Sequence, residues 1–205
     1  AAGTATITYT VAGTGGCPNA TATRTVTVTA APVAGTLSGT QNVCVGLTTT
    51  FSSTQTGGTW SSSNTGTATI NATTGLITGV AAGTATITYT VAGTGGCPDA
   101  TATRTVTISA IPTLSINDNT IIEQNGNATF IVSLSSVVPC DVSFTVNTAN
   151  NTAISILDYT AIVNANFIIP AGSTSVSINV PILDDLLFEG SENYFVNLSS
   201  SINAT

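Results

Sequence analysis

Histidine, lysine and methionine are absent from this 205-residue sequence, and two arginines are its only basic residues. Without His or Lys, the commonest general bases and Schiff-base chemistry are missing. A net charge of −7 cannot neutralise a row of phosphates, so we expect no nucleic acid partner. No apolar run approaches the roughly 20 residues that span a bilayer, so we expect no membrane span. Since Met is absent, we expect the sequence to be part of a longer chain.

The few charges are distributed unevenly along the chain. The first 110 residues carry two Arg and one Asp, whereas residues 111–205 carry eight acidic residues and no basic one. This step predicts a domain boundary near Ile111 and Pro112. Abundant Thr and other β-branched residues at low charge are typical of strands rather than of disorder.

The first half contains an internal repeat. Residues 1–30 recur at 81–110 with three differences, which are Asn19/Asp99, Val28/Ile108 and Thr29/Ser109. The spacing of 80 residues suits one small β-sandwich per repeat. We therefore expect residues 31–110 to form a complete repeat, and residues 1–30 to be the closing strands of a truncated repeat.

Alternation predicts the strands of this repeat. Residues 84–91 and 101–108 each place Thr on one face, and a Gly- and Pro-rich loop joins them as a hairpin. With five shorter runs upstream, the repeat has the strand content of an immunoglobulin-like sandwich. We expect Trp60 to fill the core, with sugar stacking as the alternative. Arg104 should cover the core with its stem while its head reaches water. The upstream runs are 33–38, 47–54, 58–62, 67–71 and 76–78.

Strand patterns continue through the second half. The fold class is therefore predicted to be all-β, with tandem immunoglobulin-like sandwiches arranged as an elongated rod. The expected strands are 113–117, 128–134, 142–147, 166–169, 175–181 and 194–198.

The run GGTWSSSNTGTATINATTGLITGVAAGTATITYTV resembles the bacterial Ig-like (group 2) repeats of very large surface adhesins. The Thr-rich form, with one Cys near the second strand and one in the last hairpin, is similar to repeats in secreted, cell-surface proteins of gliding bacteria. The resemblance implies an extracellular location at the cell surface and names no ligand.

Acidic side chains dominate the second half. Six of its eight acids gather at three places without a nearby Lys or Arg, and a hard cation is the simplest compensation. Ca²⁺ is the common one outside cells. A solvated acidic face is the alternative, and glycosidase chemistry is disfavoured because nothing else builds a sugar cleft. The six acids are Glu123, Asp158, Asp184, Asp185, Glu189 and Glu192.

These acids lie in motifs that resemble a Calx-beta domain. The motifs are Glu123-x-x-Gly126 followed by ATFIVSLS, then Asp158-Tyr159, then IPAGSTSVSINVPILDDLLFEGSENYFVNLS. In the calcium-binding members the matching positions are ligands. The resemblance thus implies a Ca²⁺ site made by the six carboxylates and a backbone carbonyl of Leu187. Position 186 is Leu where some members have a third Asp. We interpret residues 111–205 as a Calx-beta-like sandwich that lacks its final strand.

Four cysteines allow disulfides in an oxidising exterior. Cys44 is expected in the first loop of the repeat and Cys97 in its final hairpin loop. In an immunoglobulin-like sandwich these two loops lie at opposite ends. Strands of about eight residues at ~3.3 Å rise separate the two ends by roughly 25 Å, whereas bridged Cα atoms lie within ~7 Å. We therefore favour an inter-domain Cys44–Cys140 bridge and keep Cys44–Cys97 as the alternative. In the favoured arrangement, Cys97 and Cys17 pair with cysteines outside this chain.

These features together predict a non-catalytic structural stalk segment of a large secreted cell-surface adhesin, stiffened by disulfides and calcium. The alternative is a spacer or carbohydrate-binding module of a large secreted enzyme. We expect the partners to be neighbouring domains of the same chain, with surface glycans or other cell-surface proteins as further candidates.

Overall fold

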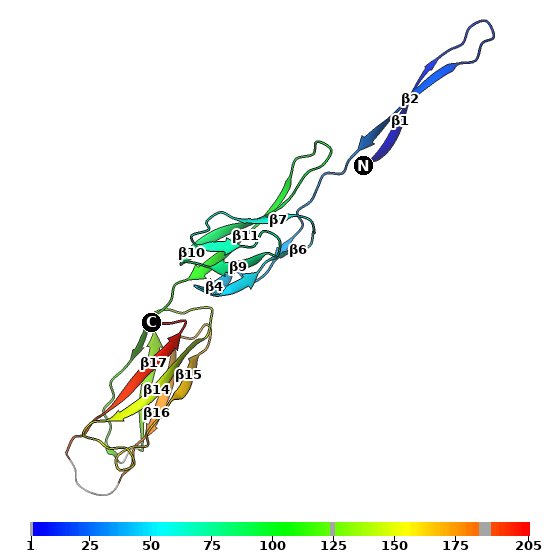
Figure 1. Ribbon diagram of the computed structural model, residues 1–205. Coiled ribbons are helices and arrows are strands. Elements are labelled where there is room, and N and C mark those ends of the chain that lie inside the picture. Colours follow the sequence, from blue (N-terminus) through cyan, green and yellow to red (C-terminus); the bar gives the residue numbers. More distant parts are fainter. Residues whose placement is uncertain (1, 124–125, 185–189) are drawn as a thin grey trace.

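The computed structural model describes residues 2–123, 126–184 and 190–205, and its regular elements are β-strands (Figure 1). The prediction of an all-β fold is confirmed. Among the described residues, no helix has the length and apolar character needed to cross a membrane.

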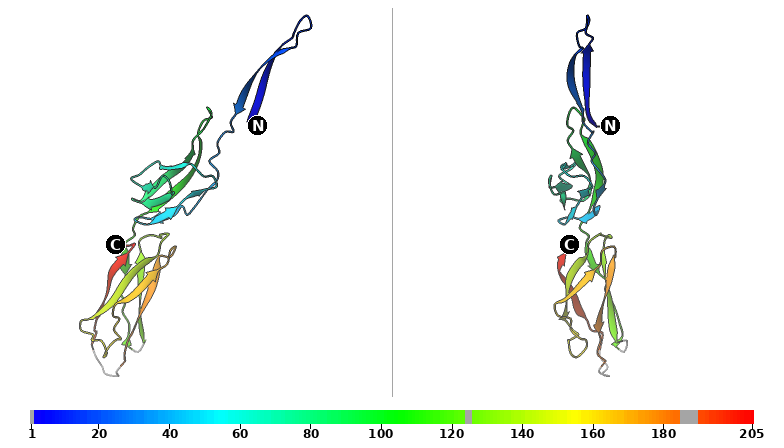
Figure 2. Two further views of the ribbon diagram at one scale, coloured as in Figure 1. Left: turned by 45° about the vertical axis from the view of Figure 1, so that its right-hand side comes forward. Right: turned by 90° about the vertical axis from the view of Figure 1, so that its right-hand side faces the viewer.

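A long hairpin precedes the first sandwich. Strands β1 (Gly3–Val11) and β2 (Ala20–Val28) pair with each other and form a separate two-stranded sheet. Every residue of the two strands is exposed. Figure 2 shows the hairpin as an extended ribbon in two further views.

The first sandwich packs a four-stranded sheet, in the order β4-β11-β10-β7, against a three-stranded sheet, β5-β9-β8, with a short β3-β6 pair beside them. Thr alternates with apolar residues along β10, so Ala85, Ile87 and Tyr89 face the core. The strands are β3 (Leu37–Ser38), β4 (Asn42–Cys44), β5 (Thr48–Thr50), β6 (Ser52–Ser53), β7 (Thr59–Ser62), β8 (Ala68–Ile70), β9 (Leu76–Gly79), β10 (Gly83–Val91) and β11 (Ala100–Ser109).

Trp60 lies in this core, as the sequence predicts. Its side chain is 6% exposed, and its ring centroid lies 4.6 Å from that of Tyr89. An indole that is buried in this way offers no face to a sugar, which excludes the stacking alternative.

The second sandwich contains two three-stranded sheets, in the orders β12-β13-β16 and β15-β14-β17. Their facing apolar side chains, including Val132, Phe144 and Ile178, form one buried cluster. Next to it, Thr205 N donates to Pro112 O and Leu114 N donates to Thr205 O, so the last residue lies along the start of β12. The strands are β12 (Leu114–Ile116), β13 (Asn127–Leu134), β14 (Val142–Asn150), β15 (Ala165–Ile169), β16 (Ser175–Pro181) and β17 (Tyr194–Ile202).

Two local predictions for the first sandwich need correction. Residues 47–54 do not form one strand, because the chain leaves the β5 sheet at the buried Phe51 and enters the β3-β6 pair. Strand β4 was expected to be loop, but Cys44 ends it, in parallel register with Ser109 of β11. A run of three residues is too short for alternation to reveal, so only the pairing with β11 identifies it.

The prediction for Arg104 also needs correction. Its guanidinium does not simply reach water, because it donates to Leu37 O at 3.4 Å and to Gly39 O at 3.0 Å. It also lies over the Phe51 ring, 5.5 Å from the centroid. These hydrogen bonds hold residues 37–39, near the start of the repeat, against its last strand, β11.

Candidate functional site

An acidic cavity lies at one end of the second sandwich. Its volume is about 380 Å³, and its lining includes three of the predicted acids, Glu123, Asp158 and Glu192. Ile182 and Tyr194 contribute to the same lining. These residues come from four separate segments of the chain, which the strand topology brings to one end.

The environment of Glu192 shows that the three carboxyl groups interact. Partial loss of hydration raises the pKa of Glu192 above the usual value for a glutamate. The charge of Asp158, a hydrogen bond with Asp158 and the charge of Glu123 raise that pKa further. Like charges therefore accumulate in this cavity, as the sequence pattern suggests.

Asp158 is held by a tight turn. Its carboxylate accepts a hydrogen bond from Ile154 N at 2.6 Å, and its own N–H donates to Ile154 O at 3.0 Å. Leu183 N donates to Asp158 O at 3.0 Å, which joins this turn to the segment between β16 and Asp184. Asp158 therefore has a defined place relative to the end of β16.

A pair of stacked tyrosines supports the acidic cavity. The Tyr159 ring is 1% exposed, its hydroxyl lies 2.6 Å from Asn150 Oδ1, and its centroid lies 4.2 Å from that of Tyr194. Burial, and then the neighbouring Tyr159, raise the pKa of Tyr194 to about 12. The Tyr194 hydroxyl is buried and has no hydrogen-bond partner among the described residues.

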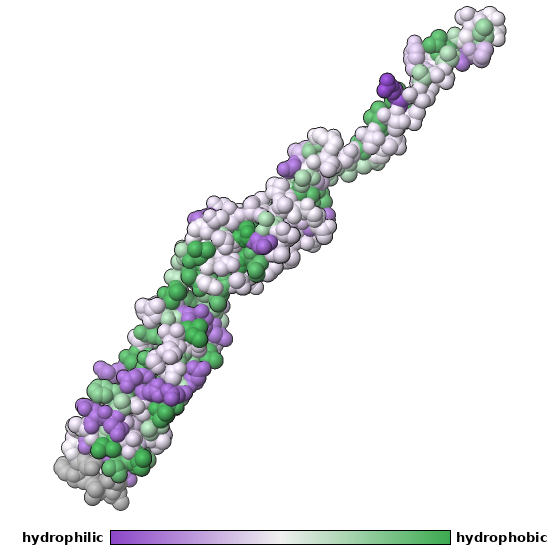
Figure 3. Space-filling model, viewed as in Figure 1, coloured by the Kyte–Doolittle hydropathy of each residue, from purple (hydrophilic) through white to green (hydrophobic). Residues whose placement is uncertain are grey.

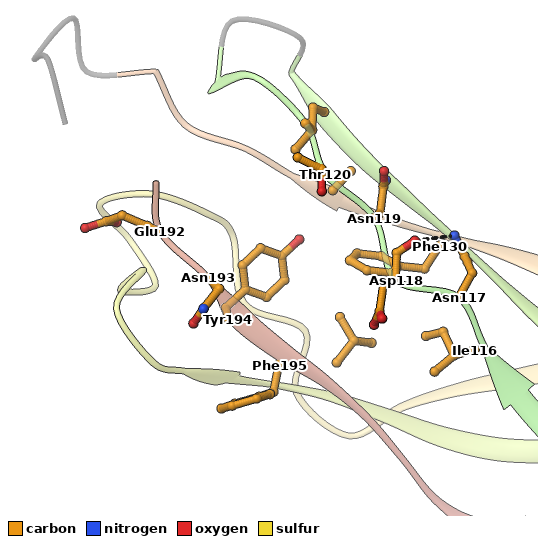
Figure 4. Close-up of a pocket in the computed structure, with 13 residues that line it drawn as sticks. Ile116, Asn117, Asp118, Asn119, Thr120, Phe130, Glu192, Asn193, Tyr194 and Phe195 are labelled. Carbon is orange, nitrogen blue, oxygen red and sulfur yellow. Dashed lines mark hydrogen bonds between the residues drawn. The ribbon is translucent and has the colours of Figure 1, made fainter. Parts of the chain in front are cut away.

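A second cavity of about 440 Å³ shares Glu192 and Tyr194 with the acidic one (Figure 4). Asp118, Asn119 and Phe130 line its other side. In Figure 4 the Tyr194 ring reaches toward Asn119 and Thr120. The sequence patterns gave no role to Tyr159 or Tyr194, although both lie within the acidic motifs.

The seven predicted calcium ligands are only partly described by the structure. Glu123, Asp158 and Glu192 line one cavity, whereas Asp185, Leu187 and Glu189 lie outside the described residues. Within residues 2–123, 126–184 and 190–205, no three acidic, Cys or His side chains form a group that could hold a metal ion. The complete calcium site remains a prediction.

A disulfide joins the two sandwiches. Cys44, at the end of β4, is bonded to Cys140, in the loop between β13 and β14, with their Cα atoms 6.2 Å apart. The bond spans 96 residues of sequence. Cys44 is 4% exposed and belongs to the apolar cluster of the second sandwich, beside Val138 and Leu134. Of the two pairings considered, the structure thus has the inter-domain one.

The other two cysteines are free thiols, Cys17 being exposed and Cys97 partly buried. Cys97 lies in the loop after β10, with its Sγ 3.9 Å from Thr29 O. Thr29 follows the last residue of β2. Cys97 therefore lies close in space to the end of the β1-β2 hairpin, although 68 residues separate it from Thr29 in the sequence.

Comparison with domain families gives two matches in chain order. The bacterial Ig-like domain (group 2) matches residues 22–103, and the Calx-beta domain matches residues 108–205. Matches to these two domain types imply an extracellular or cell-surface β-sandwich module. No curated protein matches the sequence.

Among solved structures, the crystal structure of the apo-form Calx CBD1 domain is similar at 20% identity and a TM-score of 0.37. The match covers 39% of this chain and 70% of that one. The crystal structure of CBD12 from CALX1.2 is similar at 19% identity and a TM-score of 0.39, over 58% of this chain. This chain spans about half of that structure, at 48% of its length.

Proposed function

We propose that the chain is a stalk segment of a large secreted cell-surface adhesin, in which disulfides and calcium stiffen a series of sandwiches. The observation that carries the proposal is the Cys44–Cys140 bond between consecutive sandwiches. A bond there restricts hinge motion between modules. A load-bearing stalk requires this restriction, whereas a freely jointed linker does not. No part of this role requires the chain to catalyse a reaction.

The repeat supports the same role. An almost identical hairpin recurs after 80 residues, as expected for modules added in series to extend reach. The scarcity of Lys and Arg suits an exposed fibre, since trypsin-like proteases cleave after those residues. A spacer in a large secreted enzyme would share these features, so function within the full-length protein is the deciding test.

That test is removal of residues 31–205 from the full-length protein. We expect its surface projections, measured by electron microscopy, to shorten while receptor binding is retained. Loss of binding specificity, or capture of a glycan by the isolated 205-residue chain on an array, would instead indicate a ligand-binding module.

Stiffening by the disulfide can be measured on the chain itself. Small-angle X-ray scattering should show that the oxidised chain samples a narrower range of maximum dimensions than the Cys44→Ala/Cys140→Ala variant does. Cys17→Ser is the matched control, because Cys17 is exposed and unbonded. Identical scattering from the oxidised chain and the double variant would contradict the role of the bond.

Calcium binding is the second part of the proposal. The carboxylates of Glu123, Asp158 and Glu192 share a cavity, and the remaining ligands would come from Asp184, Asp185, Leu187 and Glu189, as in the calcium-binding members of the Calx-beta family. Partial loss of hydration, and then the charges of Asp158 and Glu123, raise the pKa of Glu192, and a cation there would offset those charges.

Thermal unfolding in millimolar Ca²⁺, Mg²⁺ or EDTA tests the calcium site. We expect Ca²⁺ alone to raise the melting temperature, since a ligand at a hundredfold excess over its Kd stabilises the folded state by ~2.7 kcal/mol. Asp158→Asn should reduce the shift. Asp99→Asn should not, because Asn19 already occupies the equivalent position of the repeat. Equal melting in Ca²⁺ and EDTA would exclude the ion.

A further inference from the structure

The apolar face of the β1-β2 hairpin has no cover among the described residues. Ile7, Tyr9 and Val26 are 57%, 71% and 48% exposed, and the two strands pair only with each other. Figure 3 shows apolar patches along this hairpin as well as on the sandwiches. A face of this kind in a secreted chain marks an interaction surface.

The second copy of the hairpin shows what covers such a face. β10 and β11 have the same pairing register as β1 and β2, since Tyr89↔Ala102 repeats Tyr9↔Ala22. Their apolar residues are nevertheless buried, with Ile87 at 0% exposed and Tyr89 at 4%. All of the burying partners in that core outside the hairpin come from residues 34–77. The buried ones are Ala34, Leu37, Val43, Phe51, Trp60, Ala68 and Ile77, and Val45 and Ile70 are partly buried.

Residues 34–77 also satisfy the polar groups of the second hairpin. The Tyr89 hydroxyl donates to Gln55 O at 2.9 Å and accepts from Gly58 N at 2.8 Å. The guanidinium of Arg104 donates to the Leu37 and Gly39 carbonyls. Tyr9 and Arg24 stand at the same positions of the first hairpin. The first hairpin therefore presents the same apolar and polar requirements.

The position of Cys97 points independently to the same occupant. In the first sandwich, Cys44 lies opposite Ser109 in the β4-β11 register, and it bonds to Cys140 of the following sandwich. Thr29 is the equivalent of Ser109 by the 80-residue repeat. Cys97 Sγ lies 3.9 Å from Thr29 O. A segment paired with β2 as β4 pairs with β11 would bring its own cysteine to Cys97.

We propose that the β1-β2 face binds a copy of residues 31–80 that directly precedes Ala1 in the polypeptide, and that the Cys44 equivalent of this copy forms a disulfide with Cys97. The chain order supports this occupant, since Val80 is followed by Ala81 in the repeat and Ala1 is the equivalent of Ala81. Each joint in the series would then have the same bond as Cys44–Cys140.

The bond forms by thiol–disulfide exchange. The two thiols lose two protons and two electrons, and a disulfide oxidant such as oxidised glutathione is reduced to two thiols. The inference rests on the modular architecture of the proposed function and not on adhesion. Its failure would leave the Cys44–Cys140 joint and the stalk proposal intact.

The experiment uses an extended chain in which a second copy of residues 31–80 stands directly before Ala1. After refolding with reduced and oxidised glutathione, non-reducing peptide mapping should recover the added cysteine bonded to Cys97. Amide hydrogen exchange in β1 and β2 should slow to the rates of β10 and β11. In the 205-residue chain, β1 and β2 should exchange fast.

Two variants of the extended chain separate docking from bonding. With Cys97→Ser, the amides of β1 and β2 should stay protected while the added cysteine remains a thiol. With Arg24→Met, protection should decrease, because the guanidinium loses the carbonyl acceptors that Arg104 has in its own sandwich.

Three results would overturn the inference. The first is fast exchange of β1 and β2 in the extended chain. The second is recovery of the added cysteine bonded to Cys17 instead of Cys97. The third is a dimer of the 205-residue chain with protected β1-β2 amides, because the face would then be covered by exchange between two chains.

Discussion

Arg24 and Arg104 show how one side chain acquires a role from its surroundings. Both lie opposite an isoleucine in the same hairpin register, in nearly identical sequence. Arg24 is exposed, whereas the guanidinium of Arg104 contacts two carbonyls and an aromatic ring. Hydrogen bonds from a charged donor and a cation–π contact together stabilise the fold by about 2–3 kcal/mol.

Replacing Arg104 should therefore destabilise the first sandwich. We expect Arg104→Met to lower its free energy of unfolding by about 2–3 kcal/mol, because the Leu37 and Gly39 carbonyls lose their donor. Urea denaturation followed by the fluorescence of Trp60, the single Trp of the chain, measures this. Arg24→Met is the matched control and should change the value by less than about 0.5 kcal/mol. Equal effects of the two variants would contradict the role of Arg104.

The ionisable groups around Tyr194 make stability depend on pH. Since burial raises the pKa of Tyr194 to about 12 from an ordinary 10, its contribution is complete below pH 10 and is lost as the pH rises towards 12. Tyr194→Phe should lessen the loss of stability over this range and remove a tyrosine that ionises near pH 12, as measured by ultraviolet absorbance. An unchanged alkaline titration would contradict the assignment.

The turn before β9 shows how a short element depends on a single backbone position. Asn71 Oδ1 accepts hydrogen bonds from the N–H groups of Thr73 and Thr74, and Gly75 follows with φ +73°. A Cβ at Gly75 would lie 2.3 Å from Phe51 O. The turn can therefore close on the point where the chain changes sheets only if this residue has no side chain.

Adding one methyl group at this turn should be costly. Gly75→Ala should destabilise the first sandwich by about 2–4 kcal/mol, because backbone strain adds to the clash with the Phe51 carbonyl. Gly57→Ala is the control, since Gly57 has a similar φ of +82° with no atom near its Cβ position. It should cost only about 1 kcal/mol. Urea denaturation followed by the fluorescence of Trp60 measures both values. Equal destabilisation by the two variants would contradict the role of Gly75.

At the scale of the whole molecule, the Cys44–Cys140 disulfide joins the two sandwiches. Cys44 belongs to β4 of the first sandwich, but its side chain packs among the apolar residues of the second. The bond therefore couples the stability of one sandwich to the packing of the other. Apolar contact alone would leave the joint with the relative motion expected between domains.

Removal of the bond should destabilise the chain. We expect the Cys44→Ala/Cys140→Ala variant to lose about 2–4 kcal/mol of unfolding free energy, because the unfolded chain is no longer closed into a long loop. Differential scanning calorimetry with and without reductant checks this, and reductant should no longer affect the variant. A melting profile in which reductant leaves the parent chain unchanged would contradict it.

The linear pattern of residues determined the long strands, the repeat and the all-β class. These features depend on local rules: Thr alternates with apolar residues along β10, and a side chain two residues away always faces the same side. The repeat also determined which hairpin positions are equivalent. Cys44–Cys140 could be favoured from the expected ends of the sandwiches, although β4 itself was too short to recognise.

Other features depended on how distant segments pack. Arg104 finds its carbonyl acceptors 65 and 67 residues away, so no local pattern reports them. Glu123, Asp158 and Glu192 share a cavity only because three loops meet at one end of the second sandwich. Likewise, Ile7 and Ile87 have the same neighbours in sequence, and only the sheets packed around Ile87 make it part of a core. Local sequence determines which face of a strand is apolar, and tertiary packing determines what covers that face.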